Sequence, residues 1–202
     1  MSNWILAIDT SGPNGGIALA QGQQLVEAVD IHATDGFGHL LFGHIEALLH
    51  RHALKAHDIA CFAAASGPGS FTGLRVALAA VKGLAEGTGK PALAISNLQA
   101  VAWHGTSDLR APYFDARRQE FYGGLFDAQL CPLAEETVMP LDLWKASLPA
   151  HAELITFDQS LAPAVAAIAY QRLLDGHLQD PAALEANYVR RSDAELNWKD
   201  NG

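Results

Sequence analysis

The chain has 202 residues, of which 50% are hydrophobic and 17% are charged, so it can bury a substantial core and is not expected to be disordered. Its formal net charge is -9, and the only adjacent basic pairs are Arg117–Arg118 and Arg190–Arg191. Independent tight binding to RNA or DNA is therefore not expected, because proteins that bind nucleic acid alone normally carry a basic face.

The amino-terminal and cysteine features are typical of a cytoplasmic protein. The first residues, MSNWILAIDTSG, lack a basic segment, and Asp9 interrupts their apolar run, so they do not resemble a signal peptide. No segment reaches the roughly 18 apolar residues that a membrane span requires. Cys61 and Cys131 have no CxxC spacing, which favours packing roles in a reducing compartment. We therefore expect a cytoplasmic location and no membrane contact.

The first half of the chain predicts the element order βββαβαβα. The expected elements are strands at 4–11, 17–21 and 25–31, a helix at 38–54, a strand at 59–65, a helix at about 72–86, a strand at 92–96 and a short helix at 98–104. Three antiparallel strands followed by β–α–β crossovers produce a mixed sheet with helices on its faces. This order is that of the ribonuclease H-like and actin-like ATPase folds, so an α/β lobe of that type is expected.

The pattern changes after Gly105, which predicts two lobes, at 1–105 and 106–202. Residues 111–128, APYFDARRQEFYGGLFDA, indicate a hairpin with a polar turn, and a proline-punctuated stretch follows. A strand at 153–158 and a helix at 161–176 come next, with Gly176 in the position expected after a helix end. This late helix is expected either to belong to the smaller second lobe or to pack back onto the first.

Two loops have the composition of phosphate-binding loops. SGPGSFTG (66–73) joins a strand to a helix, but it matches neither the P-loop nor the dinucleotide fingerprint. Asp9, Thr10 and Ser11 precede a glycine turn, as in the first phosphate loop of actin-like ATPases, where an aspartate faces the metal-bound nucleotide. The alternative is an ordinary hairpin, so these three residues are interpreted as a possible vestigial phosphate loop.

Other catalytic patterns are missing from the sequence. The nine histidines contain no pair at i,i+3 or i,i+4 spacing, so no helix presents two metal ligands on one face. Ser70 lies outside a GxSxG motif, which argues against a serine nucleophile. We therefore expect no catalytic residue, no metal and no cofactor.

The helices around 38–54 and 72–86 are apolar over a broad arc, which predicts a partner interface. If one small lobe offers only one sheet face, some apolar helix surface must be covered by another subunit. The alternative is plain core packing. The expected interface residues are Leu41, Ile45, Leu48, Leu49, Leu74, Ala77, Ala80, Val81 and Leu84.

Four segments together resemble the TsaB (YeaZ) family of threonylcarbamoyladenosine-biosynthesis subunits, paralogues of the glycoprotease-like TsaD family. They are ILAIDTS, SGPGSFTGLRVALAAVKGLA, DARRQEFY and YVRRSDAELNW. The most specific is the glycine motif, formed by Gly67, Pro68, Gly69, Ser70, Phe71, Thr72, Gly73 and Arg75. Its small residues are expected to start the helix that docks a partner.

The resemblance implies an actin-like fold that has lost its own ATPase and metal chemistry. It implies pairing with TsaD, association with the P-loop ATPase TsaE, and a homodimer when alone. Such complexes transfer a threonylcarbamoyl group to the adenosine beside the anticodon, so tRNA is expected to bind only within the complex. The second lobe is short for the family, which leaves any partner contact there open.

Two other classes of function remain open from the sequence. One is an independent actin-like ATPase, phosphotransferase or metalloprotease, for which Asp9 and the two glycine loops are the motivation. The other is a homodimeric interaction module unrelated to tRNA. A non-catalytic partner subunit of a tRNA-modifying transferase complex explains the motifs best.

Overall fold

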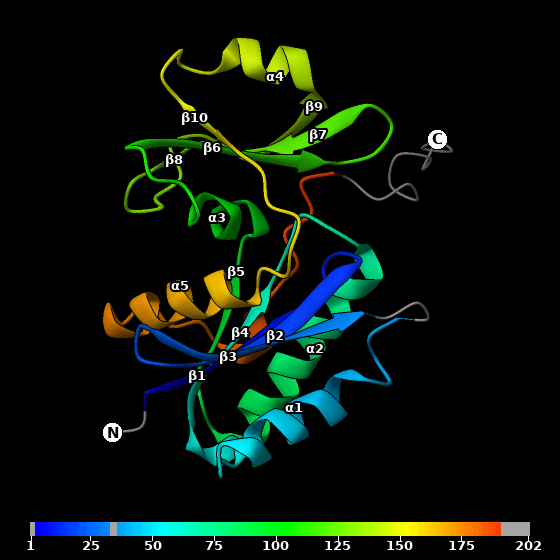
Figure 1. The fold of residues 1–202 in the computed structure, drawn as a ribbon, viewed down its shortest axis with the longest axis vertical. Helices are drawn as coiled ribbons and strands as arrows, with labels where there is room; N and C mark the ends of the chain where they lie inside the picture. Colours follow the sequence, from blue (N-terminus) through cyan, green and yellow to red (C-terminus); the bar gives the residue numbers. More distant parts are fainter. Residues whose placement is uncertain (1–2, 33–35, 191–202) are drawn as a thin grey trace, which may run out of the picture.

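A computed structural model describes residues 3–32 and 36–190 of the chain, and Figure 1 shows its arrangement. The first sheet has the strand order β3-β2-β1-β4-β5. Its strands are β1 (Trp4–Asp9), β2 (Asn14–Gln21), β3 (Gln24–His32), β4 (Ile59–Ala65) and β5 (Ala92–Ile95). β1 to β3 are antiparallel neighbours, whereas β4 pairs in parallel with both β1 and β5. The predicted order βββαβαβα and the mixed sheet are thus confirmed.

Both faces of this sheet are buried, which explains why its central strands are apolar at nearly every position. In β1, Leu6 and Ile8 point into a core shared with helices α1 (Leu41–Arg51) and α2 (Phe71–Thr88). The alternate residues Ile5 and Ala7 point into a second core on the opposite face. Successive side chains of a strand alternate between faces, so helices on both sides are needed to cover them.

Helix α5 (Ala162–Leu174) covers the second face, although it comes from the late part of the chain (Figure 1). It packs against β1, β2 and β4 through small side chains such as Ala162, Ala166 and Ala169. The strands present alanines at the contact, which allows close approach. The late helix therefore packs on the first sheet, while the proposed lobe boundary at residue 106 stays a prediction.

The second sheet has the strand order β10-β6-β7-β9, with β8 beside β6. Its strands are β6 (Leu109–Asp115), β7 (Glu120–Gly123), β8 (Phe126–Asp127), β9 (Thr137–Pro140) and β10 (Glu153–Ile155). In Figure 1, α3 (Asn97–Ala102) and α5 lie between the two sheets, and α4 (Leu141–Ser147) lies on the outer side of the second. β9 and α4 fall in the stretch that the sequence predicted only as loose chain. Two single-turn 3-10 helices, η1 (Ala56–Asp58) and η2 (Pro181–Ala183), complete the elements.

The ends of α2 follow from capping chemistry. Ser70 is the N-cap residue, and its hydroxyl accepts a hydrogen bond from the Gly73 backbone N–H. Gly89 ends the helix in the left-handed conformation, with φ of 65°. Among the described residues, no helix has the length and hydropathy that a membrane crossing requires.

Candidate functional site

The Asp9 carboxylate at the end of β1 is buried and hydrogen-bonded within the chain. Its Oδ1 accepts from the backbone N–H of Ser11 at 2.9 Å and from the Ser11 hydroxyl at 2.6 Å. Its Oδ2 accepts from the backbone N–H of Leu161, just before α5, at 2.7 Å. Burial raises the pKa of Asp9, and the hydrogen bonds from Ser11 and Leu161 oppose that rise. The carboxylate ties β1 to the start of α5.

The glycine loop packs tightly against the residues that follow Asp9. The Thr10 hydroxyl donates to the Gly73 carbonyl at 2.7 Å, and the Ser70 backbone N–H donates to the Ser11 carbonyl at 2.7 Å. A Cβ at Gly73 would overlap the Thr10 carbonyl oxygen, and one at Gly69 would lie 2.7 Å from the Ser11 carbonyl oxygen. Glycine is required here because two backbones come into contact. We call this contact between 9–11 and 69–73 the loop junction.

Asn97 holds the first half of the glycine loop from the other side. Its Oδ1 accepts from the Gly67 N–H at 3.0 Å, and its Nδ2 donates to the Pro68 carbonyl at 2.9 Å. The peptide bond between Gly67 and Pro68 is cis. The Gly67 carbonyl in turn accepts from the Asn97 N–H at 2.8 Å. Gly67, Pro68, Gly69 and Gly73 of the motif thus act through backbone contacts.

The exposed motif residues lie in a different environment. Phe71 is 45% exposed, and its ring lies 5.4 Å from that of Tyr188. The Arg75 guanidinium lies over the Phe71 ring at 3.8 Å and donates through Nε to the Tyr188 hydroxyl at 3.2 Å. Thr72 is also exposed. This side of the motif faces outward, toward a cleft.

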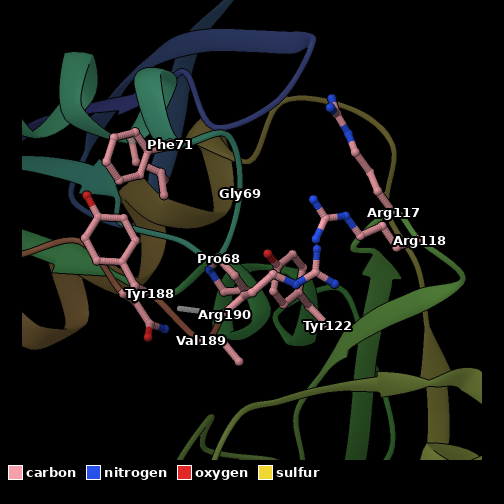
Figure 2. A pocket seen from close by; sticks show the side chains of 11 residues that line it. Pro68, Gly69, Phe71, Arg117, Arg118, Tyr122, Tyr188, Val189 and Arg190 are labelled. Atoms are coloured by element: carbon pink, nitrogen blue, oxygen red, sulfur yellow. The ribbon is translucent and has the colours of Figure 1, made fainter. Parts of the chain in front are cut away.

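The cleft lies between the start of α2, the β6–β7 turn and residues 187–190, and has a volume of about 330 Å³. Figure 2 shows Phe71 and Tyr188 at one end and Arg117 and Arg118 at the other, with Arg190 in front of Tyr122. We call it the arginine cleft and define it by Phe71, Arg117, Arg118, Tyr122, Tyr188 and Arg190. Three segments that carry the family resemblance therefore meet at one place.

The turn that supplies two of these arginines has an unusual backbone. Arg117, Arg118 and Gln119 all have positive φ, between 56° and 64°. Residues with side chains seldom adopt this conformation, so surrounding contacts must hold it. The Asp115 carboxylate accepts from the Arg117 N–H at 2.7 Å, and the Ala116 N–H donates to the Glu120 carbonyl at 2.9 Å.

Arg190 is fixed against the β6–β7 hairpin, which also carries Arg117 and Arg118. It forms an ion pair with Glu120, donates to the Ala116 carbonyl at 2.8 Å and lies 5.8 Å from the centre of the Tyr122 ring. The remaining residues of YVRRSDAELNW, from Arg191 onward, lie outside the described residues.

Most of the predicted partner-interface residues are buried in the chain's own core. Leu41, Ile45, Leu48, Leu49, Leu74, Ala77, Ala80 and Val81 are at most 6% exposed, and Leu84 is half-buried. The expectation that another subunit covers these side chains is wrong, because α1 and α2 share one sheet face and α5 covers the other. The surplus apolar area inferred from the sequence is buried within the chain.

A different set of residues forms the outward side of α1 and α2. Phe42 is 55% exposed. Several other exposed positions of α1 and α2 carry glycine or alanine, which leaves the helix backbones accessible to a partner there. We define the outer helix face as Phe42, Gly43, Ala47, Ala79 and Gly83.

Glu136 is a half-buried carboxyl group that the sequence patterns do not single out. It accepts hydrogen bonds from the Ser96 hydroxyl and from Asn187 Nδ2, the latter at 2.6 Å. Burial raises its pKa, and both hydrogen bonds oppose the rise. The Asn187 N–H donates to the Ser66 carbonyl at 2.7 Å, so Glu136 helps to fasten the segment before Tyr188 to the glycine loop. No sequence signal distinguishes Glu136 from its neighbour Glu135.

The described part of the chain contains no cluster of side chains that could hold a metal ion. Among residues 3–32 and 36–190, no three His, Cys, Asp or Glu side chains are placed to hold an ion. Cys61 is buried, and burial raises the pKa of its thiol to about 12, as expected for a packing residue. Cys131 is exposed.

The fold and the loop junction define an actin-like α/β protein whose first phosphate-loop region is packed against its own chain. The family model described as TsaD, tRNA N6-adenosine threonylcarbamoyltransferase, matches residues 33–142, more than half of the chain. The chain belongs to this family, and it is similar to proteins of the TsaB (YeaZ) group.

Individual relatives agree with this assignment. TsaB of Bacillus subtilis is 33% identical over 124 residues, which cover 60% of this chain and 54% of that protein, so the match spans about half of the relative's length. A Pseudomonas aeruginosa protein described as similar to the peptidase YeaZ has a TM-score of 0.81 at 24% identity, with 94% of this chain and all of that one covered.

A more distant structure supports the fold class. The activator of 2-hydroxyisocaproyl-CoA dehydratase from Clostridium difficile has a TM-score of 0.50 at 9% identity, with 86% of this chain and 97% of that one covered. It has an actin-like ATPase-type fold, so the predicted fold class is confirmed. At such low identity the likeness concerns the fold alone.

Proposed function

We propose that this chain is a non-catalytic subunit in the biosynthesis of threonylcarbamoyladenosine in tRNA. It binds and activates TsaD, together with TsaE, for transfer of the threonylcarbamoyl group to the adenosine beside the anticodon. Membership of the matched family and similarity to a TsaB protein support this role. In this proposal tRNA is bound by the assembled complex, and the chain forms a homodimer when alone.

The observation that carries the proposal is that the Asp9 carboxylate is hydrogen-bonded to groups of its own chain. In an actin-like ATPase the corresponding acid faces a metal-bound nucleotide. Here three donors from Ser11 and Leu161 already bind its two oxygens, and the loop junction brings backbone into contact beside it. Binding a metal–nucleotide there would require these contacts to break. A role as a partner subunit needs no such rearrangement.

The outer helix face is the partner surface in this proposal. Its small side chains let a partner helix approach closely, and Phe42 supplies an exposed apolar anchor. TsaD and a second copy of this chain would use the same face, so they would compete. This surface replaces the buried set predicted from the sequence, while keeping the same two helices.

A reconstitution experiment tests the proposal. Purified chain, TsaD, TsaE, a source of threonylcarbamoyl-adenylate and tRNA are combined, and the modified adenosine is measured. Ala79→Glu places a charge on the outer face of α2, and we expect pairing with TsaD and modification to be lost, because an unpaired buried carboxylate is costly. Ala146→Glu on α4 is the matched control, since Ala146 is also an exposed helical alanine.

Two results would contradict the proposal. Modification at an undiminished rate without the chain would remove the activating role. Pairing of the Ala79→Glu variant with unchanged affinity would exclude the outer helix face. Turnover of Mg-ATP by the isolated chain would instead favour the independent-enzyme alternative.

A further inference from the structure

We propose that residues 184–190, which we call the clasp, are a conformational latch that opens and closes as one unit. The closed clasp holds the glycine loop to the β6–β7 hairpin, and its residues 187–190 form part of the wall of the arginine cleft. When the clasp opens, the cleft widens and the start of α2 is uncovered. The clasp shares no residue with the outer helix face, so the latch does not depend on the proposed pairing with TsaD.

The clasp joins the two sheets at three successive anchors. Leu184 is buried in the core that the first sheet shares with α1 and α2. The Asn187 N–H donates to the Ser66 carbonyl at 2.7 Å, at the start of the glycine loop. Arg190 donates to the Ala116 carbonyl at 2.8 Å, in the β6–β7 hairpin. The clasp therefore connects the core of the first sheet to the second sheet.

Side chains, rather than a helix or strand, hold the outer part of the clasp. The described residues 184–190 belong to no helix or strand, and beyond Leu184 each of them is half-buried or exposed. Asn187 donates through Nδ2 to Glu136 at 2.6 Å, and Arg190 forms an ion pair with Glu120. Segments with few buried contacts open at a lower free energy than the core. The clasp can therefore detach while both sheets stay folded.

The hairpin end of the clasp supports a backbone conformation that is unfavourable on its own. Residues 117–119 all have φ between 56° and 64°, in the left-handed region that residues with side chains seldom adopt. Arg190 contacts the residues on either side of this segment, Ala116 and Glu120. Because these contacts are lost when the clasp opens, the turn should relax at the same time.

Tyr188 lies between the two polar anchors and covers outward residues of the glycine motif. Its ring lies 5.4 Å from that of Phe71, and its hydroxyl accepts from Arg75 Nε at 3.2 Å. Figure 2 shows these two rings together at one end of the cleft, with Arg190 in front of Tyr122. Opening of the clasp therefore frees the start of α2 together with the hairpin turn.

The test is hydrogen–deuterium exchange of the full chain, measured by mass spectrometry. Asn187→Ala removes an anchor whose side chain contacts Gly67 and Glu136, both outside residues 116–121. We expect the amides of 116–121 to exchange about tenfold faster in this variant, because loss of a hydrogen bond to a charged group loosens the whole clasp. Arg190→Gln should in turn speed exchange of the Asn187 amide, although Arg190 contacts the hairpin.

The controls remove similar side chains elsewhere in the fold. Arg110→Gln removes an arginine of β6 that donates to the Ser107 and Ala102 carbonyls. Asn14→Ala removes an amide that donates to the Asp158 carbonyl at 2.7 Å. Both should leave exchange at 116–121 and at Asn187 unchanged. Circular dichroism verifies that each variant is folded, and Asn187→Ser replaces Asn187→Ala if the alanine variant is not.

The outcomes are decisive in both directions. The proposal holds if each clasp variant speeds exchange at the distant anchor as well as near its own position. It is overturned if the Asn187 variant changes only amides near the glycine loop, if Arg190→Gln changes only amides of the hairpin, or if neither variant changes exchange. Equal acceleration by the control variants would also overturn it.

Discussion

The two sides of the glycine loop, residues 66–73, differ in how tightly they pack against the rest of the chain. On the inner side, the loop junction brings Gly73 and Gly69 against the backbone after Asp9, and no side chain fits between. On the outer side, the same loop borders an open cleft lined with arginines and exposed rings. A glycine loop that resembles a phosphate loop thus serves as a packing element on its inner side and borders an open cleft on its outer side.

The largest effect should come from adding one methyl group at the loop junction. Gly73→Ala would place a Cβ onto the Thr10 carbonyl oxygen, and neither backbone can move without disturbing β1 or α2. We expect a loss of about 3 kcal/mol in the free energy of unfolding. Urea denaturation followed by circular dichroism measures it.

Gly83→Ala in the same helix is the matched control. Its added Cβ meets no atom within 4 Å, so alanine should stabilise α2 by about 0.5–1 kcal/mol through helix propensity alone. If both variants changed stability by the same amount, close packing would not be the reason for glycine at position 73.

The next largest effect should come from Asp9→Asn. The carboxylate receives hydrogen bonds only from groups that donate here, namely two backbone N–H groups and the Ser11 hydroxyl. An amide must turn its NH₂ group toward one of these donors, so we expect a loss of about 2 kcal/mol in stability. Asp158→Asn, at an exposed position nearby in the fold, should have almost no effect. Equal stability of Asp9→Asn and the original chain would contradict the claim that both carboxylate oxygens are needed to accept these hydrogen bonds.

The sequence predicted the fold well because the relevant signals are local. Continuous apolar runs such as that of β4, the Ser70 cap and the helical periodicity of α2 depend on neighbouring residues. Which segment covers an apolar surface depends on residues far apart in the chain. α5, which begins after residue 160, covers the second face of the first sheet, and no local sequence pattern predicts this contact. The same limit explains why Glu136 was missed, since its partners Ser96 and Asn187 are 40 and 51 residues away.

The contribution of Glu136 to stability should depend on pH. Glu136 binds Asn187, which in turn is hydrogen-bonded to the Ser66 carbonyl at the start of the glycine loop. Its pKa is raised above the ordinary value of 4.5, so its stabilising contribution is present below that value and is lost as pH rises through the folded-state pKa. The amide side chain of Glu136→Gln does not titrate. It can keep both hydrogen bonds, because the side chains of Ser96 and Asn187 can accept a hydrogen bond as well as donate one.

The stability of Glu136→Gln relative to the original chain should therefore increase between about pH 4 and pH 8. Urea denaturation across this range measures the difference, and we expect an effect smaller than that of Asp9→Asn. Glu135→Gln is the control, since Glu135 is exposed and should show no such trend. A difference that stayed constant with pH would mean that Glu136 has the same pKa in the folded and unfolded chain.

The smallest effect on stability is expected at the wall of the arginine cleft. Tyr188 is 47% exposed, and its ring contacts Phe71 while its hydroxyl accepts from Arg75. Tyr188→Ala should therefore cost only about 0.5–1 kcal/mol, and Tyr188→Phe, which keeps the ring, should cost less. Thermal and urea unfolding measure both. A loss as large as that of Gly73→Ala would mean that the cleft wall supports the fold as strongly as the loop junction, and the two sides of the loop would then not differ as described.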